Sequence, residues 1–407
     1  MLLTLNHHNM EKKQLNNKNI WIGIGVIIFI SANLRAPITA VSPILDEIKS
    51  VLKIDNFQAS LLTSIPLIVF AACSILVSKA VQKINIRHGI IYSLLILIIG
   101  LYIRIYGNVA TLYAGSLLMG LGICIGNVLT PAYIKDIFPH KIGLMTGLFS
   151  VSMSLVAAFA SGLSIAIGKW SNAGWKGSLG IWIIGGILAL FIILVDTLKN
   201  KTSTQPQTNH VNHIQFNIFR SKQAWNISIF MGIQSLVYYC LVALLPTLLI
   251  DYGMTKIEAG WVFSVLQLAM LPAMLFSPVL ATKMNDPKLM IYMTSVLYIL
   301  GISMFIFFKA KYSYISAILI GIAGGFAFSL SILFFSLRSK TMAGTIKISG
   351  MAQSIGYLIA AFGPPIFGKL YDVDSTWNYS LYFLFLCIIL MTFFGKNATK
   401  PLFIEEY

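Results

Sequence analysis

A single arginine lies inside a long apolar stretch near the start of the chain. Arg35 belongs to residues 20–42, close to Asn33, with about six residues, or roughly 9 Å of helix, left before the stretch ends. A buried guanidinium without a carboxylate partner favours an anion, because charge inside a membrane segment is costly unless it meets a ligand or a partner. Two structural roles compete with this one: the side chain can reach the membrane surface, or it can bond carbonyls freed by Pro37.

A second arginine and two small polar residues also interrupt apolar stretches. Arg104 is near the end of its stretch, where it can contact a solute or reach the membrane surface. Asn127 and Thr130 precede Pro131, whose ring frees a backbone carbonyl. We expect these two residues either to line a cavity or to pack between helices.

Amides and phenols recur as pairs in the second half of the chain. Gln234 and Tyr238 are four residues apart, and Gln353 and Tyr357 repeat this spacing, so each pair shares one helical face. Such pairs, and Gln267 with them, can bind a polar solute or can hydrogen-bond between helices. The predicted solute-binding residues are therefore Arg35, Asn33, Asn127, Thr130, Gln234, Tyr238, Gln267, Gln353, Tyr357 and Arg104.

No cluster of acidic, histidine or cysteine residues indicates catalysis. The acids that flank the apolar stretches fall in loops or at stretch ends, and the four cysteines are isolated from one another. Nucleophile, phosphate-loop and metal-ligand spacings do not occur. The sequence therefore predicts no catalytic residue, no metal site, no cofactor and no enzyme. It also argues against proton coupling through an embedded carboxylate, which leaves exchange, downhill movement or a proton carried by the solute.

Membrane-spanning helices must position these residues. Hydrophobic residues form 57% of the chain and charged residues 10%, whereas soluble domains carry about a quarter charged residues. About 20 apolar residues cross a bilayer as a helix. The pattern predicts an all-α membrane protein of 12 transmembrane helices, at residues 20–42, 59–79, 88–106, 111–134, 142–168, 178–197, 225–249, 258–282, 289–309, 312–337, 348–370 and 378–395.

A polar segment and an internal repeat divide the spans into two six-helix bundles. Leu155–Phe159 matches Leu358–Phe362, and Gln58-Ala59 matches Glu258-Ala259, which indicates parallel halves with pseudo-twofold symmetry. The predicted organisation is an N-terminal tail at 1–19, a bundle at 20–198, a cytoplasmic linker at 199–222, a second bundle at 223–396 and a C-terminal tail at 397–407.

Basic residues are unevenly distributed between the two sides of the predicted membrane. Of the 29 Lys and Arg residues, 19 fall on the side of the termini and nine on the other, with Arg35 inside a span. The positive-inside rule then places both termini in the cytoplasm, in a bacterial-type plasma membrane. Anionic lipid headgroups account for the net charge of +16, without a nucleic-acid partner.

Five local strings resemble one known family: NLRAPIT at 33–39, NVLTPAYIKDIF at 127–138, GLMTGLFSVSM at 143–153, QSLVYYCLVALLP at 234–246 and SGMAQSIGYLIAAFG at 349–363. The family that they resemble is the cyanate and 2-nitroimidazole permease branch of the major facilitator superfamily. In the first string Ala and Pro are interchanged relative to the common order, and the loop at 78–84 lacks the acid usual in the superfamily. The resemblance implies the major facilitator fold and a small solute carried by alternating access.

Together these observations predict a transporter of a small organic or inorganic anion, with Arg35 as the charge anchor. The alternative is an exporter of a neutral heteroaromatic compound, such as a nitroimidazole, that stacks on Tyr238 and Tyr357. A membrane-embedded enzyme lacks its catalytic cluster, and a channel suits two proline-broken repeats less well than alternating access does. We expect a monomer whose partners are its solute and membrane lipids.

Overall fold

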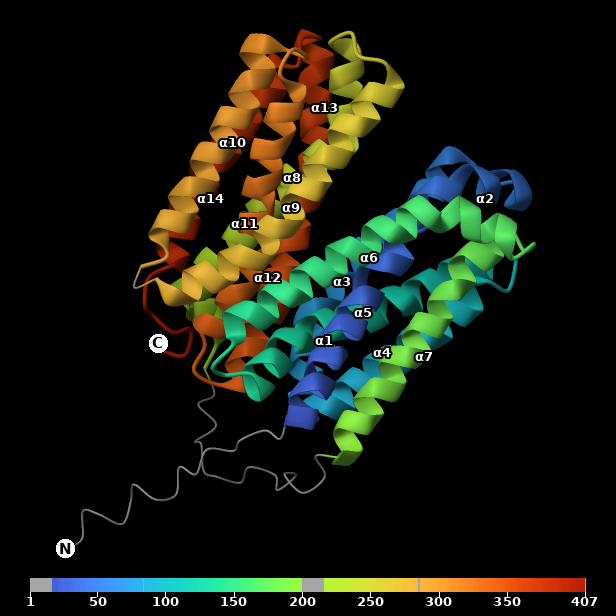
Figure 1. Cartoon of the computed structure of the whole chain (residues 1–407), viewed down its shortest axis with the longest axis vertical. Helices are drawn as coiled ribbons and strands as arrows, with labels where there is room; N and C mark the ends of the chain where they lie inside the picture. The colour runs from blue at the N-terminus through green and yellow to red at the C-terminus, as the bar shows by residue number, and fades with distance from the viewer. Residues whose placement is uncertain (1–16, 83, 200–215, 285, 407) are drawn as a thin grey trace, which may run out of the picture.

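The computed structural model describes residues 17–82, 84–199, 216–284 and 286–406, and these form helices without strands. Two bundles follow each other along the chain (Figure 1). The first contains α1 (Asn17–Thr39), α2 (Leu45–Leu52), α3 (Asn56–Val81), α4 (Ile86–Arg104), α5 (Val109–Ile137), α6 (Ile142–Trp170) and α7 (Trp175–Lys199). The second contains α8 (Lys222–Asp251), α9 (Lys256–Lys283), α10 (Lys288–Phe308), α11 (Ser313–Leu337), α12 (Met342–Ala361), α13 (Gly363–Asp374) and α14 (Asn378–Ala398).

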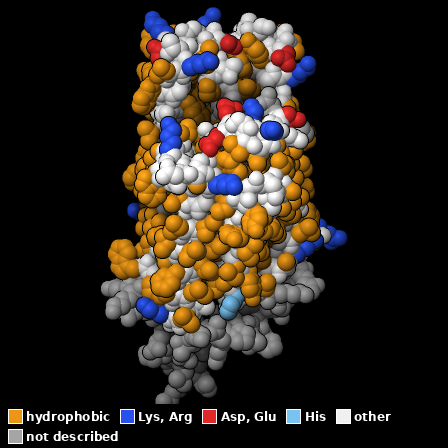
Figure 2. Space-filling view, turned by 90° about the vertical axis from the view of Figure 1, so that its right-hand side faces the viewer, with side chains coloured by type: hydrophobic (Ala, Val, Ile, Leu, Met, Phe, Trp, Pro, Cys, Tyr) orange, Lys and Arg blue, Asp and Glu red, His pale blue; other side chains and the backbone are white. Residues whose placement is uncertain are grey.

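The predicted all-α membrane fold is confirmed. Within the described residues, 11 helical stretches are long and apolar enough to cross a membrane. On the face shown in Figure 2, hydrophobic side chains cover the middle of the molecule, while charged side chains gather mainly toward its upper end. Of the predicted tail and linker, residues 1–16 and 200–215 lie outside the described residues, and a short 3-10 helix at Ile218–Arg220 leads into α8.

One predicted span differs from the structure. The stretch expected as a single helix at 348–370 is divided into α12 and α13 at Phe362. Pro364 and Pro365 follow the break, and neither can donate a backbone hydrogen bond to the preceding turn. The helix therefore ends at Ala361 and a new one begins at Gly363.

The short repeat of Gln58-Ala59 and Glu258-Ala259 corresponds to a helix N-cap in each half. Asp55 caps α3 through a reciprocal pair of hydrogen bonds with Gln58, and Thr255 caps α9 in the same way with Glu258. In each box the side chain of the third helical residue returns to the cap residue's N–H. The repeated residues thus mark the same capping position in the two halves.

The two bundles touch at one end of the molecule and spread apart at the other (Figure 1). At the touching end, near the start of α1, a Cβ at Gly143 of α6 would meet the carbonyl oxygen of Pro278 on α9 at 2.5 Å. A Cβ at Gly350 of α12 would meet the carbonyl oxygen of Ser74 on α3 at 2.6 Å. Farther along, Gly162 of α6 and Gly260 of α9 have no neighbour within 4 Å. The structure is therefore closed on the side of the termini and open on the opposite side.

Glycines also allow helices of the first bundle to approach closely. A Cβ at Gly115 of α5 would lie 2.5 Å from the backbone nitrogen of Arg104, and one at Gly122 would lie 2.7 Å from that of Leu97 on α4. Small residues let backbones approach in membranes, where packing replaces the hydrophobic effect between helices.

We predict that Gly115→Val destabilises the folded protein by about 1–3 kcal/mol or more, because the new side chain overfills a contact between two backbones. Gly162→Val is the matched control, since nothing lies within 4 Å of that position. Thermal unfolding in detergent, followed by size-exclusion chromatography, measures the difference. Equal midpoints for the two variants would contradict the packing argument.

Candidate functional site

A cavity lies where the two bundles meet, and Arg35 is the residue that α1 contributes to its wall. The empty space between its lining residues, including the part open to solvent, is about 340 Å³. Helices of the second bundle supply the rest of the wall. The lining residues are Arg35, Gln234, Ser235, Tyr238, Tyr239, Met270, Met274, Phe328 and Tyr357.

The guanidinium of Arg35 is held by aromatic faces. Its central carbon lies 5.4 Å from the ring centroid of Tyr238 and 5.7 Å from that of Phe328. The residue as a whole is half-buried. None of the ion pairs found within the described ranges includes Arg35. The cation is therefore stabilised by ring quadrupoles at the cavity wall and not by a carboxylate of the described residues.

Two hydrogen bonds between helices fix the orientation of α1. The amide nitrogen of Asn33 donates to the carbonyl oxygen of Gly185 on α7 at 3.0 Å. Thr39 donates to the carbonyl oxygen of Ala157 on α6 at 3.0 Å. Residues two apart on a helix point in nearly opposite directions. Binding Asn33 to α7 therefore turns Arg35 toward the second bundle.

The amides and phenols of the second bundle form the opposite wall. Gln267 donates from its Nε2 to the hydroxyl of Tyr238 at 3.3 Å. Gln234 donates to the hydroxyl of Ser235 at 2.7 Å. The ring of Tyr357 lies 5.2 Å from that of Phe70 on α3, so this pair joins the two bundles beside the cavity. The wall offers hydrogen-bonding groups mounted on aromatic and thioether surfaces.

Of the ten predicted binding residues, Arg35, Gln234, Tyr238 and Tyr357 line the cavity, and Gln267 hydrogen-bonds to one of them. Ser235, Tyr239, Met270, Met274 and Phe328 were not predicted. Tyr239 adjoins a predicted residue, but residues in apolar stretches such as Phe328 have no sequence signal that separates cavity lining from ordinary packing.

Asn33 and Thr130 are placed inside the first bundle and not at the cavity. Both are buried. The hydroxyl of Thr130 donates to the carbonyl oxygen of Gly126 one turn earlier, at 2.7 Å. The Asn33 amide nitrogen and the Thr130 hydroxyl thus bond backbone carbonyls, which is the packing role that the sequence left open for Thr130. The Asn33 side-chain oxygen is buried without a hydrogen-bond partner among the described residues.

Arg104 reaches neither the cavity nor the membrane surface. It is fully buried, and it donates to the carbonyl oxygen of Pro37 at 2.9 Å and to the sulfur of Met119 at 3.3 Å. Pro37 is in the last turn of α1, where carbonyls lack intrahelical donors and favour a cation. The arginine that bonds the end of α1 is thus Arg104, whereas Arg35 is left for the cavity.

Asn127 and Gln353 lie at the closed junction of the bundles. The hydroxyl of Ser349 on α12 donates to the backbone carbonyl of Asn127 on α5 at 3.3 Å, and Gln353 donates to the same hydroxyl at 2.9 Å. Ser354 donates to the carbonyl oxygen of Ala71 on α3. These contacts seal the junction between the cavity and the side of the termini.

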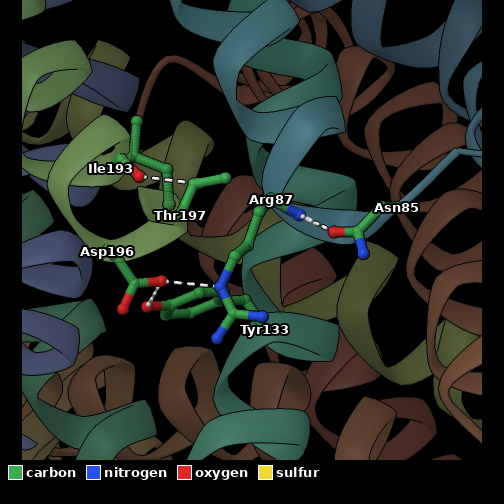
Figure 3. Close-up of polar contacts among 6 residues, drawn as sticks. All are labelled: Asn85, Arg87, Tyr133, Ile193, Asp196 and Thr197. Carbon is green, nitrogen blue, oxygen red and sulfur yellow. Dashed lines mark hydrogen bonds and ion pairs between the residues drawn. The ribbon is translucent and has the colours of Figure 1, made fainter. Parts of the chain in front are cut away.

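The buried carboxylate of α7 has its own partners, away from the cavity. Asp196 accepts from the Nε of Arg87 on α4 at 2.7 Å and from the hydroxyl of Tyr133 on α5 at 3.2 Å (Figure 3). Only 2% of the Asp196 side chain is exposed. The three residues join three helices of one bundle, and the ion pair neutralises a carboxylate that membrane burial would otherwise disfavour.

Comparisons with known proteins agree with this geometry. The family model of the Major Facilitator Superfamily matches residues 24–364. The chain is 35% identical to the "Uncharacterized transporter YycB" of Bacillus subtilis (strain 168), over 96% of this chain and 97% of that one. It is 32% identical to the "2-nitroimidazole transporter" of Escherichia coli (strain K12), over 95% and 97%. With the "Cyanate transport protein CynX" of the same organism, identity is 26% over 89% and 94%.

Solved structures show the same fold at low sequence identity. The proton:xylose symporter XylE aligns with a TM-score of 0.76 at 14% identity, over 96% of this chain and 98% of that one. FucP in the outward conformation aligns with a TM-score of 0.72 at 13% identity, over 93% and 98%. The protein is a membrane transporter and not an enzyme. The chain belongs to the major facilitator superfamily and is similar to its cyanate and 2-nitroimidazole transporter branch.

We predict that Arg87→Ala lowers the free energy of unfolding by about 3–5 kcal/mol, because it leaves the Asp196 carboxylate buried without its cation. Arg87→Ala combined with Asp196→Ala restores much of the loss, since no isolated charge remains. Unfolding midpoints of both purified variants in detergent give the comparison. A double variant less stable than Arg87→Ala alone would refute the assignment of the pair.

Proposed function

We propose that this transporter moves a small anion by alternating access and that Arg35 is its charge anchor. One observation carries the proposal: a half-buried guanidinium faces the cavity between the bundles, with aromatic rings as its neighbours and without an ion-pair partner in the described parts of the chain. An anion entering the cavity would supply the missing counter-charge. The relative named for cyanate transport supports the same solute class.

The wall opposite Arg35 suits a small polar anion. Aromatic rings cover the guanidinium, so its edges remain available for paired hydrogen bonds to a carboxylate-like or linear anion. Gln234 and the phenols of Tyr238 and Tyr357 add neutral hydrogen-bonding groups. The cavity is complete within one chain, which supports a monomer as the functional unit.

The charge distribution supports a plasma-membrane orientation with both termini in the cytoplasm. In that orientation the structure is open to the outside and closed to the cytoplasm. Uptake of a monovalent anion against an inside-negative potential costs about 2.3 kcal/mol per 100 mV. We propose that transport is driven by exchange with another anion or by the solute's own gradient. Proton coupling through an embedded carboxylate is disfavoured, since the described acids do not line the cavity.

We predict that Arg35→Ala lowers anion binding and transport by about tenfold to a hundredfold or more, because a charge-assisted hydrogen bond contributes about 1.5–3 kcal/mol. Arg35→Lys keeps the charge but loses the planar fork, so we expect it to recover little. Arg220→Ala is the matched control, because Arg220 is exposed and precedes α8. Uptake of labelled cyanate and of other small anions into proteoliposomes is measured for each variant.

A folded, monodisperse Arg35→Ala protein that transports anions like the native protein would refute the anchor. Loss of transport in Arg220→Ala as well would indicate a general effect of surface charge. Binding of each anion to purified protein, followed by the rise in unfolding temperature, separates loss of affinity from loss of movement.

A second candidate function has its own supporting observation. Tyr238, Tyr239, Phe328 and Tyr357 give the cavity several aromatic faces, which suit a flat neutral heteroaromatic solute. The relative named for 2-nitroimidazole transport points the same way. In this alternative Arg35→Ala retains transport of 2-nitroimidazole, whereas Phe328→Ala lowers it. The two variants therefore distinguish a charge-anchored solute from a stacked one.

A further inference from the structure

The last residues of the chain fold against the loop between α11 and α12. The backbone nitrogen of Ile404 donates to the carbonyl oxygen of Arg338 at 2.9 Å, and the Ile404 side chain is fully buried. Arg338 in turn donates to the carbonyl oxygens of Ala398 and Thr399, at 3.2 and 2.5 Å. We call residues 403–406 the tail segment. We call residues 336–341, which comprise the last two residues of α11 and the loop that follows, the gate loop.

Glu405 of the tail segment binds the two residues that immediately precede α12, including its N-cap residue Thr341. Its carboxylate accepts hydrogen bonds from the backbone nitrogens of Lys340 and Thr341, at 3.0 and 3.1 Å, and from the hydroxyl of Thr341 at 3.0 Å. Only 8% of the residue is exposed. A carboxylate at a helix N-terminus satisfies free amide groups and matches the helix dipole. These bonds therefore fix the backbone N–H groups of the gate loop.

The backbone carbonyl groups of the same gate loop accept hydrogen bonds from a lysine of the other bundle. Lys135, near the end of α5, donates to the carbonyl oxygen of Ser336 at 3.0 Å, to that of Ser339, and to the Ser339 hydroxyl at 2.9 Å. The hydroxyl of Ser336 donates back to the carbonyl oxygen of Pro131 on α5, at 3.2 Å. These bonds lie at the closed end of the molecule and cross between the bundles.

The two charged residues that bind the gate loop, Glu405 and Lys135, also attract each other. The Glu405 carboxylate is close enough to Lys135 for their charges to attract each other, and it also attracts Lys347 of α12. Lys135 forms no ion pair with an acid of the described residues. The hydrogen bonds and the longer-range attraction thus act together: Glu405 shapes the loop, and its charge offsets the ammonium that the loop binds.

We propose that Glu405 is a positioning residue of the transport cycle, which stabilises the state closed on the side of the termini by holding the gate loop in the form that binds Lys135. When the bundles separate at this end, Lys135 leaves the loop, whereas the bonds of Glu405 lie within the second bundle and persist. The tail segment thus sets how readily the closed end opens.

Glu406 provides a matched control beside the proposed residue. Its carboxylate pairs with the Lys340 ammonium at 2.7 Å, and both side chains are substantially exposed. It does not bond the backbone of the gate loop among the hydrogen bonds of the described residues. A role of the tail that depends only on negative charge would involve both acids, but the proposed role involves Glu405 alone.

The experiment measures the separation of the bundles at the closed end. Lys141→Cys and Lys283→Cys place spin labels on exposed positions at the start of α6 and the end of α9, in full-length protein whose four native cysteines are replaced. Pulsed electron resonance then gives the distance distribution in lipid nanodiscs. The variants are Glu405→Ala, Glu405→Gln, Glu406→Gln and Lys135→Met.

We expect Glu405→Ala to raise the ratio of separated to closed molecules by about tenfold, because the gate loop is no longer held in the form that accepts the hydrogen bonds of Lys135, and those charged bonds exist in the closed state only. Glu405→Gln keeps the side-chain size and one acceptor oxygen, so it folds and shifts the ratio less. Lys135→Met shifts it in the same direction, and adding Glu405→Ala to it has little further effect, because both act through one loop.

An unchanged distance distribution in folded Glu405→Ala and Glu405→Gln would overturn the proposal, and so would an equal shift in Glu406→Gln. Independent, additive shifts from Lys135→Met and Glu405→Ala would also overturn it. The inference depends on the alternating movement of the proposed function but not on an anionic solute. The distances can therefore confirm the gate even if Arg35→Ala retains transport.

Discussion

Placing positive charge in a membrane interior is the constraint on which the rest of this structure depends. An isolated cation there needs compensation from its surroundings, and the first bundle compensates its arginines in three ways. Arg87 has the carboxylate of Asp196, and Arg104 has the carbonyl end of α1. Arg35 has aromatic rings and the open space of the cavity. The Arg87 pair is complete within the protein, whereas the Nε and one terminal nitrogen of Arg104 are buried without a hydrogen-bond partner among the described residues. Arg35 has no ion-pair partner in the described parts of the chain.

The closed end depends on close approach and on backbone hydrogen bonding. Gly143 and Gly350 remove the side chains that would keep α6 from α9 and α12 from α3. Serine and lysine side chains then cross the junction to backbone carbonyls of the opposite bundle. Such bonds can form and break without burying an unpaired carboxylate. A junction made in this way is suited to repeated opening, because the side chains and carbonyls that separate can form hydrogen bonds with water or within their own helix instead.

The two halves share their architecture but not their details. The capping boxes of α3 and α9 are equivalent, and the contacts of α6 with α9 mirror those of α12 with α3. The prolines after Phe362 break the second half where α6 continues unbroken in the first. The cavity is also asymmetric, since one half gives the cation and the other gives most of the aromatic and amide groups.

The sequence alone determined the class of protein, because apolar length and charge bias depend on local composition and on the thickness of a bilayer. It also identified Arg35 as the exceptional side chain, together with several amides and phenols. Tertiary structure decided which of these residues meet. Asn33 and Arg104 are turned into the first bundle by partners far along the chain, whereas Thr130 is buried there and bonds its own helix. The places of Phe328 and Met270 at the cavity, and the hydrogen bonds of Glu405 to the residues before α12, depend on segments that are far apart in the sequence. A periodic apolar pattern shows that a residue is embedded, but only packing decides which face meets a neighbour and which meets a cavity.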